Sequence, residues 1–240
     1  MPDTLNTHGT PVPSFGKMKT VEAVVNGARV QREVAAHTSL LDFLRDALGL
    51  KGAKECCSVG ECGACTIMVD GEPVNSCLML AVEGQGKTIE TIEGQSAGGQ
   101  LSTVQHSFLK CGGVQCGFCI PGMVMSAEAL HRESPSAPEA EVREALSGNL
   151  CRCGGYNRMF DAMRDAAGED VHMKTADPVK GRSVGQDISR AGGVERVTGA
   201  QEFIGDLVLP GMAHARLVTL NVCRAKINRI DTSRASLCPA

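Results

Sequence analysis

Four cysteines in the second half of the chain form two tight pairs. Cys116 and Cys119 are separated by two residues, and Cys151 and Cys153 follow with one residue between them. Paired thiolates are suitable ligands for a soft metal centre. The four side chains can hold one centre only if the segment between the pairs folds back on itself.

The spacing of these pairs favours an iron-sulfur cluster over zinc. Structural zinc sites usually use cysteine pairs that are two to four residues apart, and a pair with one intervening residue is unusual there. Zinc remains the alternative on this stretch alone.

A second group of cysteines lies upstream, in the order Cys57, Cys62 and Cys65. Their C-x4-C-x2-C spacing is typical of plant-type [2Fe-2S] sites, and Cys77 is available as the fourth ligand. Small residues fill this loop, so backbone N–H groups can approach an anionic cluster; they are Gly60, Gly63 and Ala64. The sequence therefore predicts two clusters.

The composition agrees with an aliphatic, globular chain. Its 240 residues are 42% hydrophobic and only 3% aromatic, and the net charge of -3 argues against a nucleic-acid surface. We find no signal peptide and no apolar run of membrane-spanning length, so we expect no membrane span and a reducing cytoplasm. Four further cysteines are interpreted as passive side chains, namely Cys56, Cys111, Cys223 and Cys238.

Strand and turn signals predict an α+β domain over residues 18–93, after a loose arm at 1–17. Alternating runs flank Asn26-Gly27, which predicts a hairpin. A helix capped at Thr38 or Ser39 follows, and then the first cysteine loop. Further strands are expected at 65–69 and 87–92, with a turn at Asp70-Gly71. The sequence Gly86-Lys87-Thr88 is similar to part of a phosphate-binding loop, which leads into a helix whose N-terminus binds the phosphate. A strand is expected at this place instead, so we predict no phosphate site here.

A second, all-helical domain is expected over residues 94–167. Its first helix has a capping box of Ser102 with Gln105, and two helices between the cysteine pairs supply the required hairpin. The first of these covers 121–132, and the second begins at a capping box of Ser136 with Glu139. A last helix is predicted over 158–167.

Two stretches carry a more specific pattern. They read Cys62-Gly-Ala-Cys65-Thr with Asn75-Ser-Cys77-Leu, and Val114-Gln-Cys116-Gly-Phe-Cys119-Ile-Pro-Gly122 with Leu146-Ser-Gly-Asn-Leu-Cys151-Arg-Cys153. Residues 18–167 thereby resemble the iron-sulfur subunit of molybdenum hydroxylases, the family of xanthine dehydrogenase, aldehyde oxidoreductase and carbon monoxide dehydrogenase. Two departures remove no ligand: Cys56 stands where glycine is usual, and Gly154 where threonine is common.

The resemblance implies a plant-ferredoxin-like β-grasp domain with one [2Fe-2S] cluster and a four-helix domain with another. It also implies that the helical cluster lies next to molybdopterin, with Gln115 and Cys153 as pterin contacts. Electrons would then pass from the pterin through the helical cluster and the β-grasp cluster to an external acceptor. The chain itself would carry no catalytic residue.

The C-terminal part of the chain also resembles this family. After a linker at 168–193, residues 194–240 look like an incomplete start of the large molybdopterin-binding domain. The fusion layout favours an aldehyde substrate. A purine or other N-heterocycle is the alternative substrate, and a free-standing ferredoxin-like carrier the alternative function. The expected partners are a molybdenum-binding large subunit or domain and an acceptor, which a flavoprotein subunit could provide.

Overall fold

The computed structural model describes residues 17–96, 98–171, 184–213, 215, 217, 219 and 222–233. All but the last residue of the expected N-terminal arm, and the middle of the expected linker, lie outside the described residues. The chain divides into two compact units, Met1–Val208 and Leu209–Ala240. Both cysteine groups belong to the first unit.

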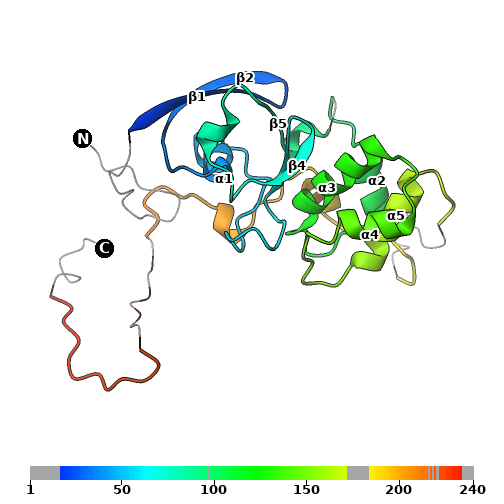
Figure 1. Ribbon diagram of the computed structural model, residues 1–240. Helices are drawn as coiled ribbons and strands as arrows, with labels where there is room; N and C mark the ends of the chain where they lie inside the picture. Colours follow the sequence, from blue (N-terminus) through cyan, green and yellow to red (C-terminus); the bar gives the residue numbers. More distant parts are fainter. Residues whose placement is uncertain are drawn as a thin grey trace. The chain divides into compact units, whose positions relative to one another are not determined.

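A five-stranded mixed sheet forms the N-terminal part of the first unit (Figure 1). Its strands are β1 (Met18–Val25), β2 (Ala28–Ala35), β3 (Thr66–Val69), β4 (Glu72–Asn75) and β5 (Thr88–Glu90). Their order across the sheet is β2-β1-β5-β3-β4. The β1–β5 pair is parallel, and the other neighbours are antiparallel.

The predicted hairpin and helix are confirmed. Asn26 and Gly27 both have positive φ, at 48° and 80°, as a tight turn between twisted strands requires. The side chain of Ser39 caps helix α1 (Leu40–Asp42), which continues as a π-helical turn over Phe43–Ala47. The apolar side of this helix packs on the sheet, with Leu40, Leu41 and Leu44 buried.

Four helices follow the sheet: α2 (Thr103–Lys110), α3 (Ile120–Glu133), α4 (Glu139–Ala145) and α5 (Tyr156–Ala166). The Ser102–Gln105 capping box of α2 is present as predicted. The box expected from Ser136 and Glu139 is wrong, because α4 begins after Pro138, which is its N-cap and accepts no side-chain bond. A proline in extended conformation defines that helix start instead.

Two details of the sheet also differ from the prediction. β5 ends at Glu90, and the chain turns into a short 3-10 helix over Ile92–Gly94, so the strand expected to reach residue 92 is shorter. β4 was not predicted. It is a short edge strand that contains Pro73, and a proline is tolerated there because an edge strand leaves some N–H groups without a ladder partner.

β3 is shared by two hydrophobic cores. Ile67 and Val69 point into the core beneath the sheet, whereas Met68 belongs to the core of the helices. Successive side chains of a strand face opposite sides, so all of Thr66–Val69 is buried. The sheet and the helices therefore pack directly against each other, and α3 lies along β3.

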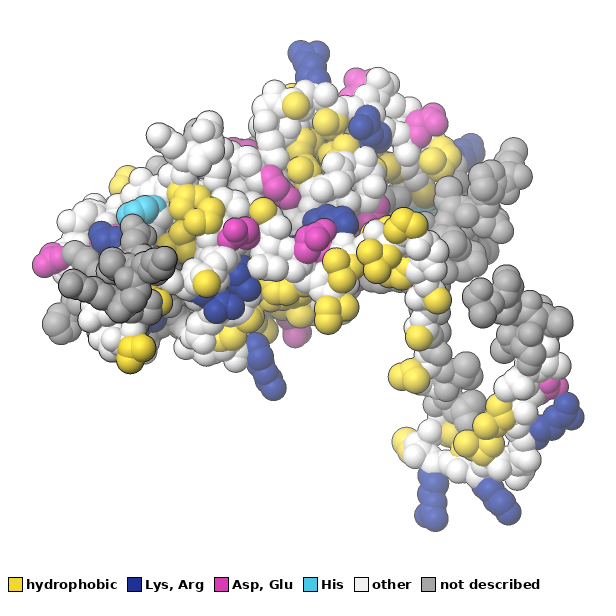
Figure 2. All heavy atoms as spheres, turned by 180° about the vertical axis from the view of Figure 1, so that it is seen from behind, with side chains coloured by type: hydrophobic (Ala, Val, Ile, Leu, Met, Phe, Trp, Pro, Cys, Tyr) yellow, Lys and Arg dark blue, Asp and Glu magenta, His cyan; other side chains and the backbone are white. Residues whose placement is uncertain are grey.

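The C-terminal unit has a different character. Its described residues contain no helix or strand, and their apolar side chains are mostly exposed, including Leu217, Ile227 and Ile230. Figure 2 shows hydrophobic and basic side chains following one another along this extended stretch. Among the helices of the described chain, none has the length and hydrophobicity that a membrane crossing requires.

Candidate metal centres

The upstream cysteines lie on two segments that flank the strands β3 and β4. Three lie on the loop that leads into β3, and Cys77 follows β4. The side chains of Cys57 and Cys62 lie close enough to shift each other's pKa, and Cys77 acts in the same way on the pKa of Cys65. The structure thus arranges the four predicted ligands as two pairs. A [2Fe-2S] cluster binds two thiolates at each of its two irons, so the pairing suits this cluster.

The backbone around Cys57 is arranged for an anionic sulfur. N–H groups of Val59, Cys62 and Glu61 point to it and lower the pKa of its thiol to about 6. Ser58 and Gly60 both have positive φ, which curls the loop so that successive N–H groups face the same way. Such a concave set of amides stabilises a negatively charged cluster without any cationic side chain.

Burial acts in the opposite direction on the neighbouring thiols. Desolvation raises the pKa of Cys65 to about 12, and it also raises the pKa of Cys62. Without a metal these two side chains therefore keep their protons at neutral pH. Cluster binding has to displace those protons, as is general for thiolate ligands.

The downstream cysteines converge as the sequence required. Cys119 immediately precedes α3, and Cys151 and Cys153 lie between α4 and α5, so the α3–α4 hairpin brings the two pairs together. The side chain of Cys153 interacts with those of Cys116 and Cys151, and the side chain of Cys119 interacts with that of Cys151. Burial raises the pKa of both Cys116 and Cys119. Interactions between neighbouring thiols thus link all four cysteines of this set.

Gln115 and Cys153 lie on one exposed hollow of about 680 Å³. Its wall is completed by Gly112, Val114, Cys116 and residues 188–191. The N–H of Cys116 donates to the sulfur of Cys153 and lowers the pKa of that thiol. Cys116 and Cys153 are therefore open to a bound molecule, whereas Cys119 is buried.

Hydrogen bonds connect the two cysteine groups. The N–H of Leu150 donates to the carbonyl of Cys62 (2.9 Å), and the side-chain amide of Asn149 donates to the carbonyl of Gly63 (2.9 Å). Asn149 is itself held by the hydroxyl of Ser126, which donates to its Oδ1 at 2.7 Å. Sequence reasoning did not assign a role to these residues, because their separation in the chain exceeds any local pattern.

A segment downstream of the four helices also contacts this region. It comprises helix α6 (Gly193–Val197) and a 3-10 turn over Ile204–Asp206. Asp206 forms buried ion pairs with Lys54 (2.9 Å) and Arg45 (2.6 Å). The ring of Phe203 meets that of Phe118 edge-on, with centroids 5.2 Å apart. The residues of this segment up to Val208 thus belong to the same compact unit as the cysteines.

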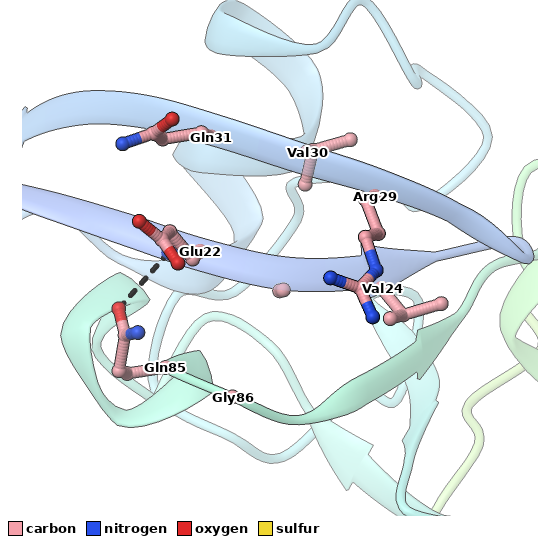
Figure 3. Close-up of a pocket in the computed structure, with 8 residues that line it drawn as sticks. Glu22, Val24, Arg29, Val30, Gln31, Gln85 and Gly86 are labelled. Atoms are coloured by element: carbon pink, nitrogen blue, oxygen red, sulfur yellow. Dashed lines mark hydrogen bonds between the residues drawn. The ribbon is translucent and has the colours of Figure 1, made fainter.

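The remaining features of the described residues do not add a ligand set. Figure 3 shows a hollow beside the β1–β2 hairpin, where Gln85 accepts a hydrogen bond from the N–H of Glu22 and Arg29 lies nearby. No cysteine lines it. No three His, Cys, Asp or Glu side chains in the described chain converge as a single-ion site requires. Of the four cysteines interpreted as passive, Cys111 is buried in the helical core, Cys56 and Cys223 are exposed, and Cys238 lies outside the described residues.

Two family models match the chain. Residues 23–88 match the "2Fe-2S iron-sulfur cluster binding domain" and residues 88–164 the "[2Fe-2S] binding domain". The fold and the sites thus define a protein with two [2Fe-2S] domains.

Characterised relatives make the assignment more specific. The chain is 45% identical over 148 residues to the xanthine dehydrogenase iron-sulfur-binding subunit of Escherichia coli O157:H7, covering 61% of this chain and 92% of that protein. It is 43% identical to the aldehyde oxidoreductase iron-sulfur-binding subunit of Escherichia coli (strain K12), covering 67% of this chain and 75% of that protein. The chain belongs to the family of iron-sulfur subunits of molybdenum hydroxylases.

Solved structures agree with this assignment. Quinoline 2-oxidoreductase from Pseudomonas putida 86 matches with a TM-score of 0.61 and 45% identity, over 62% of this chain and 93% of that chain. Aldehyde oxidoreductase from Desulfovibrio desulfuricans matches with a TM-score of 0.73 and 36% identity, over 79% of this chain but 22% of that much longer chain.

Proposed function

We propose that this chain passes electrons from a molybdopterin centre to an external acceptor through two [2Fe-2S] clusters. We assign Cys57, Cys62, Cys65 and Cys77 to one cluster and Cys116, Cys119, Cys151 and Cys153 to the other. The observation that carries the assignment is that, within both groups, each cysteine side chain interacts with at least one other cysteine of the same group. The clusters, when bound, supply one-electron transfer.

The residues of the chain supply the binding and the electrostatics. Backbone N–H groups at Cys57 and Cys153 stabilise thiolate, and burial of Cys65 and Cys119 excludes water from the inner sulfurs. The Leu150–Cys62 hydrogen bond fixes the spacing between the two groups. Hydrogen bonds and burial are general determinants of cluster potential.

Gln115 and Cys153 are proposed as the contacts to the pterin. Both line the open hollow beside the outer sulfurs, so a bound cofactor of a partner subunit or domain can reach them. This position supports an order in which the helical cluster accepts electrons before the sheet cluster. The sheet cluster would then face the acceptor, which a flavoprotein subunit could supply.

The finer organisation is also proposed. We interpret the sheet as a β-grasp domain over 18–93, the helices as the second domain over 94–167, and residues 168–193 as a linker. Residues 194–240 are interpreted as the beginning of a molybdopterin-binding domain, which the exposed apolar side chains of the C-terminal unit support. Thiolate ligands suit a reducing compartment, so we propose a cytoplasmic location.

An aldehyde is the proposed substrate of the complete enzyme. The match to aldehyde oxidoreductase from Desulfovibrio desulfuricans extends over 79% of this chain, against 62% for quinoline 2-oxidoreductase. The relatives named nicotinate dehydrogenase and caffeine dehydrogenase, which are 44% identical, support an N-heterocycle as the second candidate.

Metal analysis of the purified chain tests the cluster assignment. We expect about four irons and four acid-labile sulfides per chain, and two reducible centres in the EPR spectrum of the dithionite-reduced protein. Stoichiometric zinc, or a single reducible centre, would show that the assignment is wrong. Serine replacement of Cys65 or Cys119 should each remove only the EPR signal of its own cluster.

A further inference from the structure

We infer that two arginines downstream of the iron-sulfur domains, Arg190 and Arg196, raise the reduction potential of the helical cluster. The inference rests on the proposed assignment of Cys116, Cys119, Cys151 and Cys153 to that cluster. It concerns residues outside both matched domains, which end at residue 164.

Arg196 lies directly on the loop between the first cysteine pair. Its Nε donates to the carbonyl of Cys116 at 3.0 Å, and its Nη1 donates to the carbonyl of Gly192 at 2.6 Å. Gly117 has a φ of +90°, and a Cβ there would lie 2.4 Å from the Cγ and Cδ of Arg196. The arginine stem therefore occupies the space that a side chain at position 117 would need.

The core of the protein anchors helix α6, and this fixes the position of Arg196. Val197 is fully buried in the helical core, and its carbonyl accepts a buried hydrogen bond of 2.9 Å from the side-chain amide of Gln105. α6 packs against α2 and α3. The guanidinium is consequently held beside the cluster loop by the fold.

Arg190 lies beside the same cysteines, on the surface of the hollow. It lines that hollow together with Cys116 and Cys153, so its positive charge lies on the same surface as the two exposed thiols. Within the described residues, neither Arg190 nor Arg196 forms an ion pair with a carboxylate.

The direction of the change in reduction potential follows from the charge that reduction adds to the cluster. Reduction adds one electron, and hence one negative charge, to the cluster. A fixed positive charge nearby favours the reduced form, because unit charges several ångströms apart interact appreciably at a protein surface. Loss of either arginine should therefore lower the potential of the helical cluster while leaving the sheet cluster nearly unchanged.

An EPR-monitored redox titration of the full chain, with dithionite as reductant, tests this inference. For Arg196→Gln we expect the reduced-to-oxidised ratio of the helical cluster at a fixed potential to fall about tenfold, which corresponds to about 59 mV for a one-electron couple. Arg190→Gln, an exposed position, should shift the ratio in the same direction. Arg196→Lys keeps the charge and should lie close to the wild type.

Arg164→Gln is the matched control, because it removes one positive charge from α5 at a side chain paired with Glu169. Its effect on both clusters should be small. If Arg196→Gln and Arg190→Gln behave like this control, or shift both clusters equally, the inference is wrong. A wild-type chain without two reducible clusters would instead refute the proposed function. If Arg196→Gln fails to assemble the cluster, Arg190→Gln alone decides the question.

Discussion

The side-chain amide of Asn149 donates a hydrogen bond to the carbonyl of Gly63 across 2.9 Å, although 86 residues separate them in the chain. Gly63 lies between Cys62 and Cys65, two proposed ligands of the sheet cluster, and Asn149 lies two residues before Cys151, a proposed ligand of the helical cluster. The same amide reaches the hydroxyl of Thr66 at 3.3 Å. One buried side chain thus links both metal-binding loops.

Replacement of Asn149 by alanine should destabilise the chain. It removes one partner of the Gly63 carbonyl, which keeps the N–H and the hydroxyl of Thr66 as donors, and it leaves the buried Ser126 hydroxyl without its acceptor. Loss of such a buried partner costs about 1–3 kcal/mol. We expect the thermal unfolding midpoint, followed by circular dichroism at one scan rate, to fall by several degrees. Ser147→Ala, on an exposed hydroxyl bonded only within its own turn, is the control and should have little effect. Equal midpoints for the two variants would contradict the structural role of Asn149.

Replacement of Asp206 by asparagine should be more damaging. Burial alone would raise the pKa of this carboxyl, but hydrogen bonds from Lys54 and Arg45 outweigh burial and lower it. The variant leaves Lys54, which is 2% exposed, without its carboxylate, and breaking a buried pair costs about 3–5 kcal/mol.

The control for this experiment is Asp70→Asn, which breaks an exposed ion pair with Lys87. Exposed pairs contribute little, so this variant should unfold close to the wild type. Limited proteolysis offers a second measurement, since release of Asp206 should expose residues 198–208 to cleavage. An uncleaved variant with an unchanged midpoint would show that the buried pair does not hold this segment.

The contact between β5 and α3 should weaken in acid. Arg132 donates two hydrogen bonds to Glu90 and lowers the pKa of that carboxyl below its unfolded value. The pair therefore contributes stability above the unfolded pKa of about 4.3, and the contribution is lost as the pH falls through the lower, folded pKa.

A comparison of Glu90→Gln with the wild type checks this dependence. The wild type should have the higher unfolding midpoint between pH 5 and pH 7, and the difference should shrink steadily below about pH 4.3. Glu72→Gln, an exposed position on the edge strand β4, should show no such difference. A gap between wild type and Glu90→Gln that widens in acid would reverse the sign and contradict the prediction.

The proposed order of the clusters predicts that their variants fail differently. In the complete enzyme, Cys153→Ser alters a ligand of the first acceptor and should strand electrons on molybdenum. Cys62→Ser should still allow substrate to reduce the helical cluster, while transfer to an external acceptor falls. Anaerobic stopped-flow reduction by substrate measures both steps. The order is reversed if Cys62→Ser blocks the helical cluster and Cys153→Ser leaves the sheet cluster reducible.

Local signals in the sequence were sufficient for most elements. The Asn26-Gly27 turn, the cap at Ser39 and the Ser102–Gln105 box all appear in the structure, because each depends on residues a few positions apart. The same holds for the helical hairpin that joins the downstream cysteine pairs. Ser136 misled the prediction, since the extended Pro138 provides the N-cap two residues later.

Long-range relationships could not be predicted in this way. The Lys54–Asp206 ion pair joins residues that are 152 positions apart. No local pattern in residues 193–208 predicts that they pack against the cysteine loops. β4 was missed because Pro73 is unfavourable in a central strand, and its edge position became evident only from the sheet order. Which cysteine side chains are neighbours also depends on how the loops fold. The eight candidate cysteines themselves could be selected from their spacing in the sequence.

Gly122 lies in the first turn of α3, where an added Cβ would come within 2.1 Å of the Gly63 carbonyl oxygen. The main chain of the helical part therefore touches the main chain of the sheet part at the point where both cysteine groups meet. Together with the hydrogen bonds of Asn149 and Leu150, this contact holds the two cysteine loops against each other. Electron passage between the two centres should accordingly proceed without domain opening, and its rate should not change when glycerol raises the viscosity of the solvent.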